Sequence, residues 1–215
     1  MCPLCILCVH CAPTLTFRTI ILLYMTQLEL KTFYPKDRQS WRKWLEKNHS
    51  KSPGVWLIYY KKNSGKATVT YSESVEEALC FGWIDSTMRP RDEISFIQRF
   101  SPRKPKSVWS ALNKKRIEKL SAEGLMTAAG LEKIDIAKKN GSWTSIDHVE
   151  NFEIPADLEK AFSKNKKAFQ NFQGFAKFRR KQLLYRLGSA KLLETRKRRI
   201  IQIIKVCKEN QRTDP

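Results

Sequence analysis

The first regular pattern of apolar and polar residues predicts a helix followed by a strand. Asp37 can cap a helix that carries Trp41 and Leu45 on one face, at the spacing of an amphipathic helix, and we expect this helix to end near His49. The run Val55–Tyr60 is β-branched and aromatic and lies between turn residues, which is typical of a buried strand.

A second helix and two more strands are predicted from the next 50 residues. The helix is expected to begin at Ser72 or Ser74, because Ser74 and Glu77 have the spacing of a capping box. Residues 83–86 and 94–100 are strand-like runs joined by a polar connection. Together these segments predict a small mixed sheet with helices packed against it.

The strand-like run at 94–100 has an alternating pattern that separates its side chains into two sets. Successive residues of a strand point to opposite faces of the sheet. One face receives Ile94, Phe96, Gln98 and Phe100, and the other receives Ser95, Ile97 and Arg99.

Helices dominate the remainder of the chain. Ser107 can cap a helix that contains Trp109 and ends at Gly124, and Thr127 can cap the next one. Beyond residue 151 nothing resembles a strand, and four further helices are expected. The fold class is therefore α+β, with an all-helical C-terminal subdomain.

The domain organisation follows from these patterns. We place an α+β domain at residues 31–142 and the helical C-terminal subdomain at residues 152–210, separated by a polar, loop-like stretch. Residues 1–30 are predicted to be a dispensable extension, because Met25 begins a polar sequence that looks like an ordinary start.

The N-terminal extension contains four cysteines at three-residue spacing, which superficially resembles an iron–sulfur or zinc motif. They are Cys2, Cys5, Cys8 and Cys11. Because no distant Cys-x2-Cys pair completes a ligand set, we predict no metal site. The apolar run Thr19–Tyr24 is too short to span a bilayer, and no positive charge precedes Arg18, so a secretory signal is poorly formed and a soluble, cytoplasmic protein is expected.

Charge is the unusual feature of the composition. The chain has 41 Lys and Arg against 21 Asp and Glu, for a formal net charge of +20. Such a charge attracts anionic partners, for which nucleic acid, a nucleotide, an anionic envelope component and an acidic protein are all candidates. The positive charge is concentrated in residues 89–119 and 174–215.

The first basic segment predicts an anion site where a loop enters a helix. Unpaired N–H groups at a helix start favour an anion, arginines supply forked donors, and an aromatic ring can cover a ligand. The candidate residues are Arg99, Arg103, Lys104, Lys106, Ser107, Trp109, Asp85 and Trp83. The alternative is a rigid connection set by prolines, with Ser107 as a simple cap, Trp109 in the core and the charges in solvent.

The second basic segment predicts a diffuse polyanion surface on amphipathic helices. Its candidate residues are Arg179, Arg180, Lys181, Arg196, Lys197, Arg198 and Arg199. Such helices can track phosphates, lie on an anionic membrane surface, or pack with a solvated outer face. All three interpretations remain open at this point.

Several stretches resemble the YdeI/OmpD-associated family, whose members are also labelled bacteriocin-protection proteins. They are EEALCFGWIDS at 76–86, QRFSPRKP at 98–105 followed by Ser107, Trp109, Ser110 and Asn113, GLMTAAGL at 124–131, and FRRK, SAK and ETR in the tail. The resemblance runs from about Thr32 to Lys208. It implies a role in tolerance of cationic antimicrobial peptides and bacteriocins, with an outer-membrane porin as partner in some bacteria, and carries over no catalytic residues.

The sequence favours a non-enzymatic binding protein without a cofactor, because none of the well-marked nucleotide, zinc-protease or hydrolase motifs is present. Cys80 and Cys207 lie in apolar runs and are predicted to be buried. One alternative is an enzyme for a small phosphorylated substrate in a pocket around Asp85, Arg99 and Arg103, with Asp85 or Cys80 as the reacting group. Another is a protein-interaction module for an acidic partner.

Overall fold

The computed structural model describes residues 30–211, which form two hydrophobic cores. The first core is built on a four-stranded sheet with strand order β1-β2-β4-β3. Its strands are β1 (Thr32–Phe33), β2 (Val55–Tyr60), β3 (Trp83–Asp92) and β4 (Ser95–Pro102). Because β1 pairs in parallel with β2 and the other pairs are antiparallel, the sheet is mixed. The predicted α+β class is confirmed.

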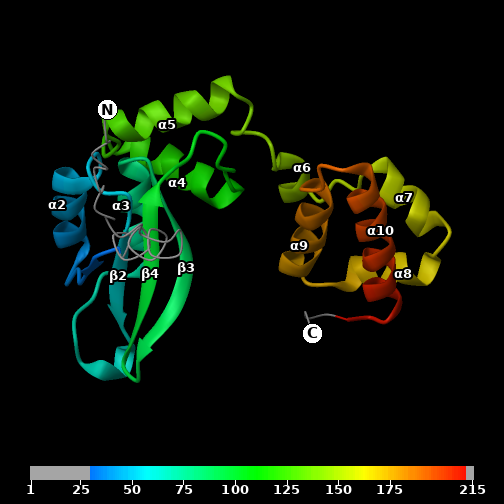
Figure 1. The fold of residues 1–215 in the computed structure, drawn as a ribbon, viewed down its shortest axis with the longest axis horizontal. Helices are drawn as coiled ribbons and strands as arrows, with labels where there is room; N and C mark the ends of the chain where they lie inside the picture. The colour runs from blue at the N-terminus through cyan, green and yellow to red at the C-terminus, as the bar shows by residue number, and fades with distance from the viewer. Residues whose placement is uncertain (1–29, 212–215) are drawn as a thin grey trace, which may run out of the picture.

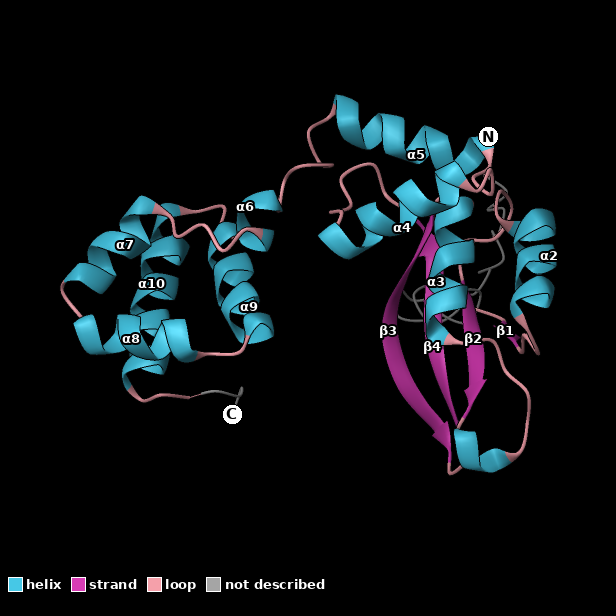
Figure 2. Ribbon diagram, turned by 180° about the vertical axis from the view of Figure 1, so that it is seen from behind, coloured by secondary structure: helices cyan, strands magenta, loops and turns pink. Residues whose placement is uncertain are grey.

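Helices cover one face of this sheet. They are α2 (Arg38–Asn48), α3 (Tyr71–Cys80), α4 (Ala111–Ala122) and α5 (Ala128–Lys139), and a short 3-10 turn, η1, occupies Lys62–Ser64. Figure 2 shows α3 lying across the sheet, whereas among the described residues no helix covers the opposite face. The strands direct Val55, Leu57 and Phe100 into the core, where the side chains of Trp41 and Trp83 are fully buried.

The close packing of α5 on α3 depends on a glycine. A Cβ atom added at Gly130 would lie 2.3 Å from the backbone oxygen of Cys80, far inside van der Waals contact. The N-cap of α5, Thr127, also donates its hydroxyl to that oxygen at 2.7 Å. These contacts hold α5 near the end of the sheet at which β3 begins (Figure 1).

Two of the four predicted helix starts in this part are confirmed and two are wrong. Asp37 and Thr127 are N-caps, as predicted. Helix α3 is capped by Thr70 instead of Ser72 or Ser74, because Thr70 forms a reciprocal capping box with Glu73. Helix α4 is capped by Ser110 instead of Ser107, since Trp109 first has to enter the core before the helix begins.

The second core belongs to five helices, α6 (Asp147–Glu150), α7 (Ala156–Ser163), α8 (Lys166–Gly174), α9 (Lys177–Gly188) and α10 (Leu193–Lys208). Its buried residues include Leu158, Phe172, Leu184 and Ile203. The expected helical C-terminal part is therefore present, and α6 is a short helix inside the stretch that we expected to be a loop. The cysteines of residues 1–11 and the start at Met25 lie outside the described residues.

The connection between the two cores lies between α5 and α6 (Figure 1). Trp143 packs on Trp109 with ring centroids 5.2 Å apart and belongs to the first core, whereas Ile146 packs against the second. An ion pair of 2.5 Å between Lys114 and Asp147 joins α4 to α6. The domain boundaries at 142 and 152 stay predictions.

Candidate anion site beside Asp85 and Arg103

The register of the sheet decides which predicted residues meet. Asp85 on β3 is directly opposite Phe100 on β4, so both point to the helix-covered face. Arg99 is opposite Trp56 and points to the other face. Asp85 and Arg99 therefore lie on opposite sides of the sheet, and the predicted pocket around Asp85, Arg99 and Arg103 does not form.

Asp85 is held by two donors from different elements. The Tyr71 hydroxyl, at the start of α3, donates to Oδ2 of Asp85 at 2.8 Å, and Nε2 of the buried Gln98 donates to the same oxygen at 3.3 Å. Gln98 also donates to the Ser86 carbonyl at 2.9 Å, which fixes its amide group. The carboxylate is therefore oriented, with Oδ1 left available as an acceptor.

Tyr71 stays protonated because of these surroundings. Partial burial raises the pKa of Tyr71 to about 12, and the hydrogen bond to Asp85 and the negative charge of that carboxylate act in the same direction. The charge of Arg116 opposes the shift. Tyr71 is thus a hydrogen-bond donor throughout the neutral range.

Arg103 is a buried cation without an ion-pair partner among the described residues. Its side chain is 3% exposed, the guanidinium lies 3.6 Å from the centroid of the Trp109 ring, and Nη1 donates to the Val108 carbonyl at 3.0 Å. Nε and Nη2 are buried and make no hydrogen bond. Burial lowers the pKa of Arg103 to about 10, and the charge of Asp85 partly opposes this shift.

The second guanidinium of the cluster comes from α4. Arg116 donates through Nη1 to Oδ1 of Asn113 at 3.1 Å and through Nη2 to the Ser72 hydroxyl at 3.4 Å. It therefore bridges α4 to the first turn of α3, beside Tyr71. We define the Asp85 cluster as Tyr71, Asp85, Gln98, Arg103 and Arg116.

Sequence reasoning found two of these five residues, Asp85 and Arg103. The signal for Gln98 was present, because a polar residue stood at the strand face that also carries Phe100. No sequence pattern identified Tyr71 and Arg116 as site residues, because their positions depend on how α3 and α4 pack on the sheet.

Apart from Trp109, whose ring lies against Arg103, the other predicted residues do not join the cluster. Trp83 is buried in the core and donates Nε1 to the His49 carbonyl at 3.1 Å. Ser107 closes a turn by accepting a hydrogen bond from the Lys104 backbone at 3.1 Å, while the Lys104 and Lys106 side chains are exposed. Side chains from 140 and 142 bind the carbonyl of Pro105, so the turn is a rigid connection.

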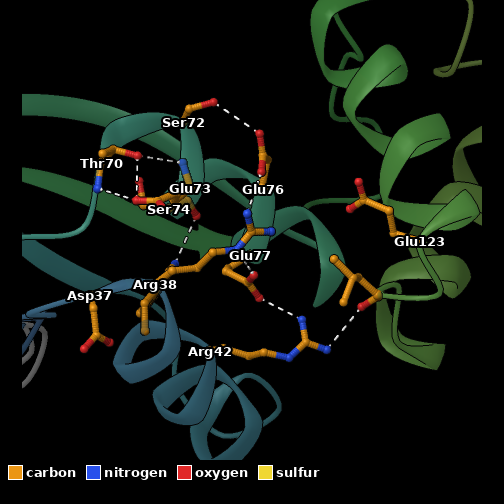
Figure 3. Close-up of polar contacts among 12 residues, drawn as sticks. Asp37, Arg38, Arg42, Thr70, Ser72, Glu73, Ser74, Glu76, Glu77 and Glu123 are labelled. Atoms are coloured by element: carbon orange, nitrogen blue, oxygen red, sulfur yellow. Dashed lines mark hydrogen bonds and ion pairs between the residues drawn. The ribbon is translucent and has the colours of Figure 1, made fainter.

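A second ionic cluster lies where α2 packs on α3, as Figure 3 shows. Glu77, 2% exposed, accepts from Nε of Arg38 at 2.6 Å and from Nη1 of Arg42 at 2.8 Å. Arg38 also pairs with Glu76 at 3.0 Å, and Arg42 donates to the Leu125 carbonyl at 3.2 Å. We call this set, Arg38, Arg42, Glu76 and Glu77, the Glu77 cluster.

The thiol of Cys80 lies beside the Glu77 cluster, and its surroundings make it unreactive. Burial and the charge of Glu77 raise the pKa of Cys80 to about 11, although Arg42 and Arg38 oppose the shift. A buried thiol with a raised pKa is not a nucleophile at neutral pH. Cys207 is also buried, as predicted, and burial raises its pKa to about 12.

Most of the predicted C-terminal cations are engaged inside the helical part. Arg179 is buried and donates to Gln182, and Arg180 lies over the rings of Phe152 and Phe172. The remaining partners are Glu150 for Lys181, Asp157 for Arg196, and the Arg186 carbonyl and Ser189 for Arg199. Lys197 and Arg198 project into solvent. Fewer of these cations are therefore available to bind a polyanion than the sequence suggests.

Two kinds of feature are absent from the described residues. No group of His, Cys, Asp and Glu side chains between residues 30 and 211 has the arrangement of a metal site. In the same part of the chain, no helix combines the length and apolar character needed to cross a membrane.

Comparisons with known proteins divide the chain in two. Residues 33–133 match the model of a family described as a domain of unknown function (DUF8412). Neither the curated proteins nor the solved structures contain a match. Residues 151–210 match the model of the family described as Bacteriocin-protection, YdeI or OmpD-Associated. The predicted resemblance to the YdeI/OmpD-associated family is thus confirmed for the helical C-terminal residues, whereas the stretches at 76–86, 98–105 and 124–131 lie in the part that matches the other family.

Proposed function

We propose that this protein is a non-enzymatic binding protein whose α+β part holds a small phosphate-bearing ligand at the Asp85 cluster. The observation that carries the proposal is Arg103, a guanidinium 3% exposed with two buried N–H positions that bond to nothing. Leaving a cation buried and unpaired costs several kcal/mol, roughly, in proteins. An anion that reached Nε and Nη2 would remove this cost.

The chemistry of the cluster narrows the ligand class. Arg103 has two N–H positions without partners that match phosphate oxygens, and Arg116, which already bonds to Asn113 and Ser72, adds a second positive charge. Asp85 offers Oδ1 as an acceptor, which suits a hydroxyl or amine on the same ligand. We therefore expect a phosphate ester with neighbouring hydroxyl groups, such as a nucleotide or a sugar phosphate.

A binding role fits this cluster better than catalysis. The predicted enzyme site relied on Arg99, which points to the other face of the sheet, and on Cys80, whose pKa is about 11. Of the two histidines in the described residues, His49 uses Nδ1 in a contact of 2.9 Å with the Leu45 carbonyl. Within the Asp85 cluster, Tyr71 donates to a carboxylate, but its pKa of about 12 keeps the phenol protonated at neutral pH, so it is a hydrogen-bond donor and not a nucleophile.

The biological role that we propose comes from the family description. Binding of a phosphate-bearing ligand would support tolerance of bacteriocins or antimicrobial peptides from a cytoplasmic location. A polymeric ligand is the second version of the proposal, although most of the cations of the C-terminal surface have internal partners. An acidic protein partner remains the third.

Isothermal titration with inorganic phosphate, pyrophosphate and a nucleoside monophosphate tests the ligand class. We expect Arg103→Met to weaken binding about tenfold to a hundredfold, because a charge-assisted hydrogen bond contributes about 1.5–3 kcal/mol. Lys104→Met is the matched control, since this cation lies next along the chain but is exposed. Equal binding by Arg103→Met and the wild type would contradict the proposal.

The polymeric version has its own experiment. Electrophoretic mobility of labelled single- and double-stranded nucleic acid is measured across a salt series, because phosphate contacts must weaken as salt rises. Absence of a shift even at low salt would remove nucleic acid as the ligand.

A further inference from the structure

The most exposed large apolar side chains of the described residues belong to α9 and α10 and the turn between them. Phe178 and Leu193 are 79% exposed, and Leu192 and Ile201 are 70% exposed. These are also the helices with the densest positive charge in the sequence. Apolar side chains that project among cations are typical of a docking surface.

Helix α10 has two distinct faces. Ile203 and Cys207 are buried in the second core. The side chains of Leu193, Lys197, Ile201 and Lys208 follow one another at four- and seven-residue spacing, so they form one outward row. We call this row, Leu193, Lys197, Ile201 and Lys208, the α10 stripe.

A shallow hollow continues the α10 stripe toward α7. It has a volume of about 410 Å³, and its lining includes Ile200, Ile201 and Ile204 together with Lys160, Lys164 and Lys208. Figure 1 shows α7 and α10 next to one another, in agreement with their contacts.

The charge around the stripe is predominantly positive. Two carboxylates are close to it. Asp157 is already neutralised by Arg196, whose Nε lies 2.6 Å from Oδ2. Glu194 is 3.8 Å from the Lys197 ammonium. Lys160, Lys164 and Lys208 have no carboxylate partner within ion-pair distance among the described residues.

We propose that the α10 stripe docks on an anionic lipid surface. Leu193 and Ile201 enter the boundary between head groups and acyl chains, while the lysines reach the lipid phosphates with their stems along the apolar layer. Each basic side chain near such a surface contributes to attraction that falls off within a Debye length. The chain then lies on the membrane through a pre-folded helix and does not cross it.

The residue types favour a lipid surface over a protein partner. Protein interfaces are enriched in aromatic residues, methionine and arginine, and they are depleted of lysine. The stripe and its neighbouring hollow have the opposite composition, isoleucine and leucine surrounded by lysine. In addition, Leu193 and Ile201 project into solvent, which suits insertion into a soft boundary.

Co-sedimentation of the full chain with phospholipid vesicles tests the proposal. Neutral phosphatidylcholine vesicles are compared with vesicles that also contain phosphatidylglycerol. A net charge of +20 attracts anionic vesicles by itself, so the decisive variant, Leu193→Ser with Ile201→Ser, leaves the charge unchanged. We expect this variant to bind the anionic vesicles about tenfold more weakly, because two apolar side chains no longer leave water.

Matched controls separate the stripe from general effects. Leu112→Ser with Leu131→Ser removes two other leucines, 58% and 46% exposed on α4 and α5, and should bind as the wild type does. Lys197→Gln with Lys208→Gln should weaken binding to anionic vesicles and reduce its salt dependence. Thermal melts of all variants check that folding is unchanged, which is expected for side chains this exposed.

Three results would overturn the proposal. They are absence of binding to anionic vesicles, equal binding by the Leu193/Ile201 variant and the wild type, and capture of an acidic amphipathic peptide by the stripe without vesicle binding. The last result would indicate a protein partner. Because Arg103→Met leaves the stripe intact, it should still bind vesicles, so failure of the ligand proposal and failure of the lipid proposal are distinguishable.

Discussion

Two arginine environments in the α+β part, each with one buried charged side chain, Glu77 or Arg103, differ in how that charge is balanced. In the Glu77 cluster, Arg38 and Arg42 both bond to a carboxylate that is 2% exposed (Figure 3). Arg103 is buried to the same degree as Glu77, yet its stabilising contacts are the Trp109 ring and a single carbonyl. The charge of the first environment is balanced by a carboxylate, whereas Arg103 has no carboxylate partner among the described residues.

A buried charged side chain that stabilises the fold has a partner in the protein, whereas one that binds a ligand can lack such a partner. In the Glu77 cluster, two guanidinium groups balance a buried carboxylate and fix α2 against α3, although Nη2 of Arg38 is buried without a hydrogen bond. A buried cation with idle donors adds little to the folded state that a neutral side chain would not add. The proposed ligand would supply the partner that Arg103 lacks.

The largest effect is expected from breaking the Glu77 cluster. Glu77→Ala leaves Arg38 and Arg42 without their shared carboxylate at the α2–α3 contact, and removal of one partner from a buried pair costs about 3–5 kcal/mol. The free energy of unfolding from urea denaturation measures this loss. Glu76→Gln is the control, because Glu76 pairs with Arg38 alone, and a loss below about 1 kcal/mol is expected. Equal losses in the two variants would show that Glu77 has no special position.

The opposite result is expected at Arg103. Arg103→Met removes an unpaired charge and keeps an apolar chain against Trp109, so the free energy of unfolding should change by no more than about 1 kcal/mol, or rise. Arg42→Met, the counterpart in the Glu77 cluster, should lose about 3 kcal/mol because Glu77 then keeps one partner. If both variants lost the same amount, Arg103 would be a structural residue and the ligand proposal would lose its main support.

Local patterns in the sequence were sufficient for most of the elements. The helix capped by Asp37, the strand Val55–Tyr60 and the helical C-terminal part depend on neighbouring residues, and these predictions are confirmed. The predicted start of α3 was wrong because two residue pairs in this stretch have capping-box spacing. The structure forms the capping box between Thr70 and Glu73, and not the one between Ser74 and Glu77. Glu77 is instead buried against α2.

The arrangement of the candidate site could not be predicted from residues that are neighbours in the sequence, because it depends on contacts between distant elements. The alternation in β4 correctly separated Gln98 from Arg99. It did not show which of them faces Asp85, since that depends on the β3–β4 register, which shifts between Asp85 and Met88. A one-residue difference in register exchanges the two faces. The burial of Arg103 depends on the turn at residues 104–107, after which the Val108 carbonyl and the Trp109 ring lie against the Arg103 guanidinium.

The smallest effect is expected at a surface pair in the helical part. Arg196 lowers the pKa of Asp157 through a hydrogen bond, with partial burial opposing, so the folded state favours the ionised carboxyl more than the unfolded state does. The stabilisation is therefore present above the ordinary carboxyl pKa and is lost as pH falls through the lowered value.

We therefore expect Asp157→Asn to cause a small, pH-dependent loss in the free energy of unfolding. Because the pair is partly exposed and screened by solvent, the free energy of unfolding should fall by less than about 1 kcal/mol near neutral pH. Urea denaturation at neutral and at strongly acidic pH measures the difference, which should vanish in acid, where the wild-type carboxyl is protonated as well. A loss comparable to that of Glu77→Ala would contradict the comparison between the clusters, since an exposed pair would then contribute as much as a buried one.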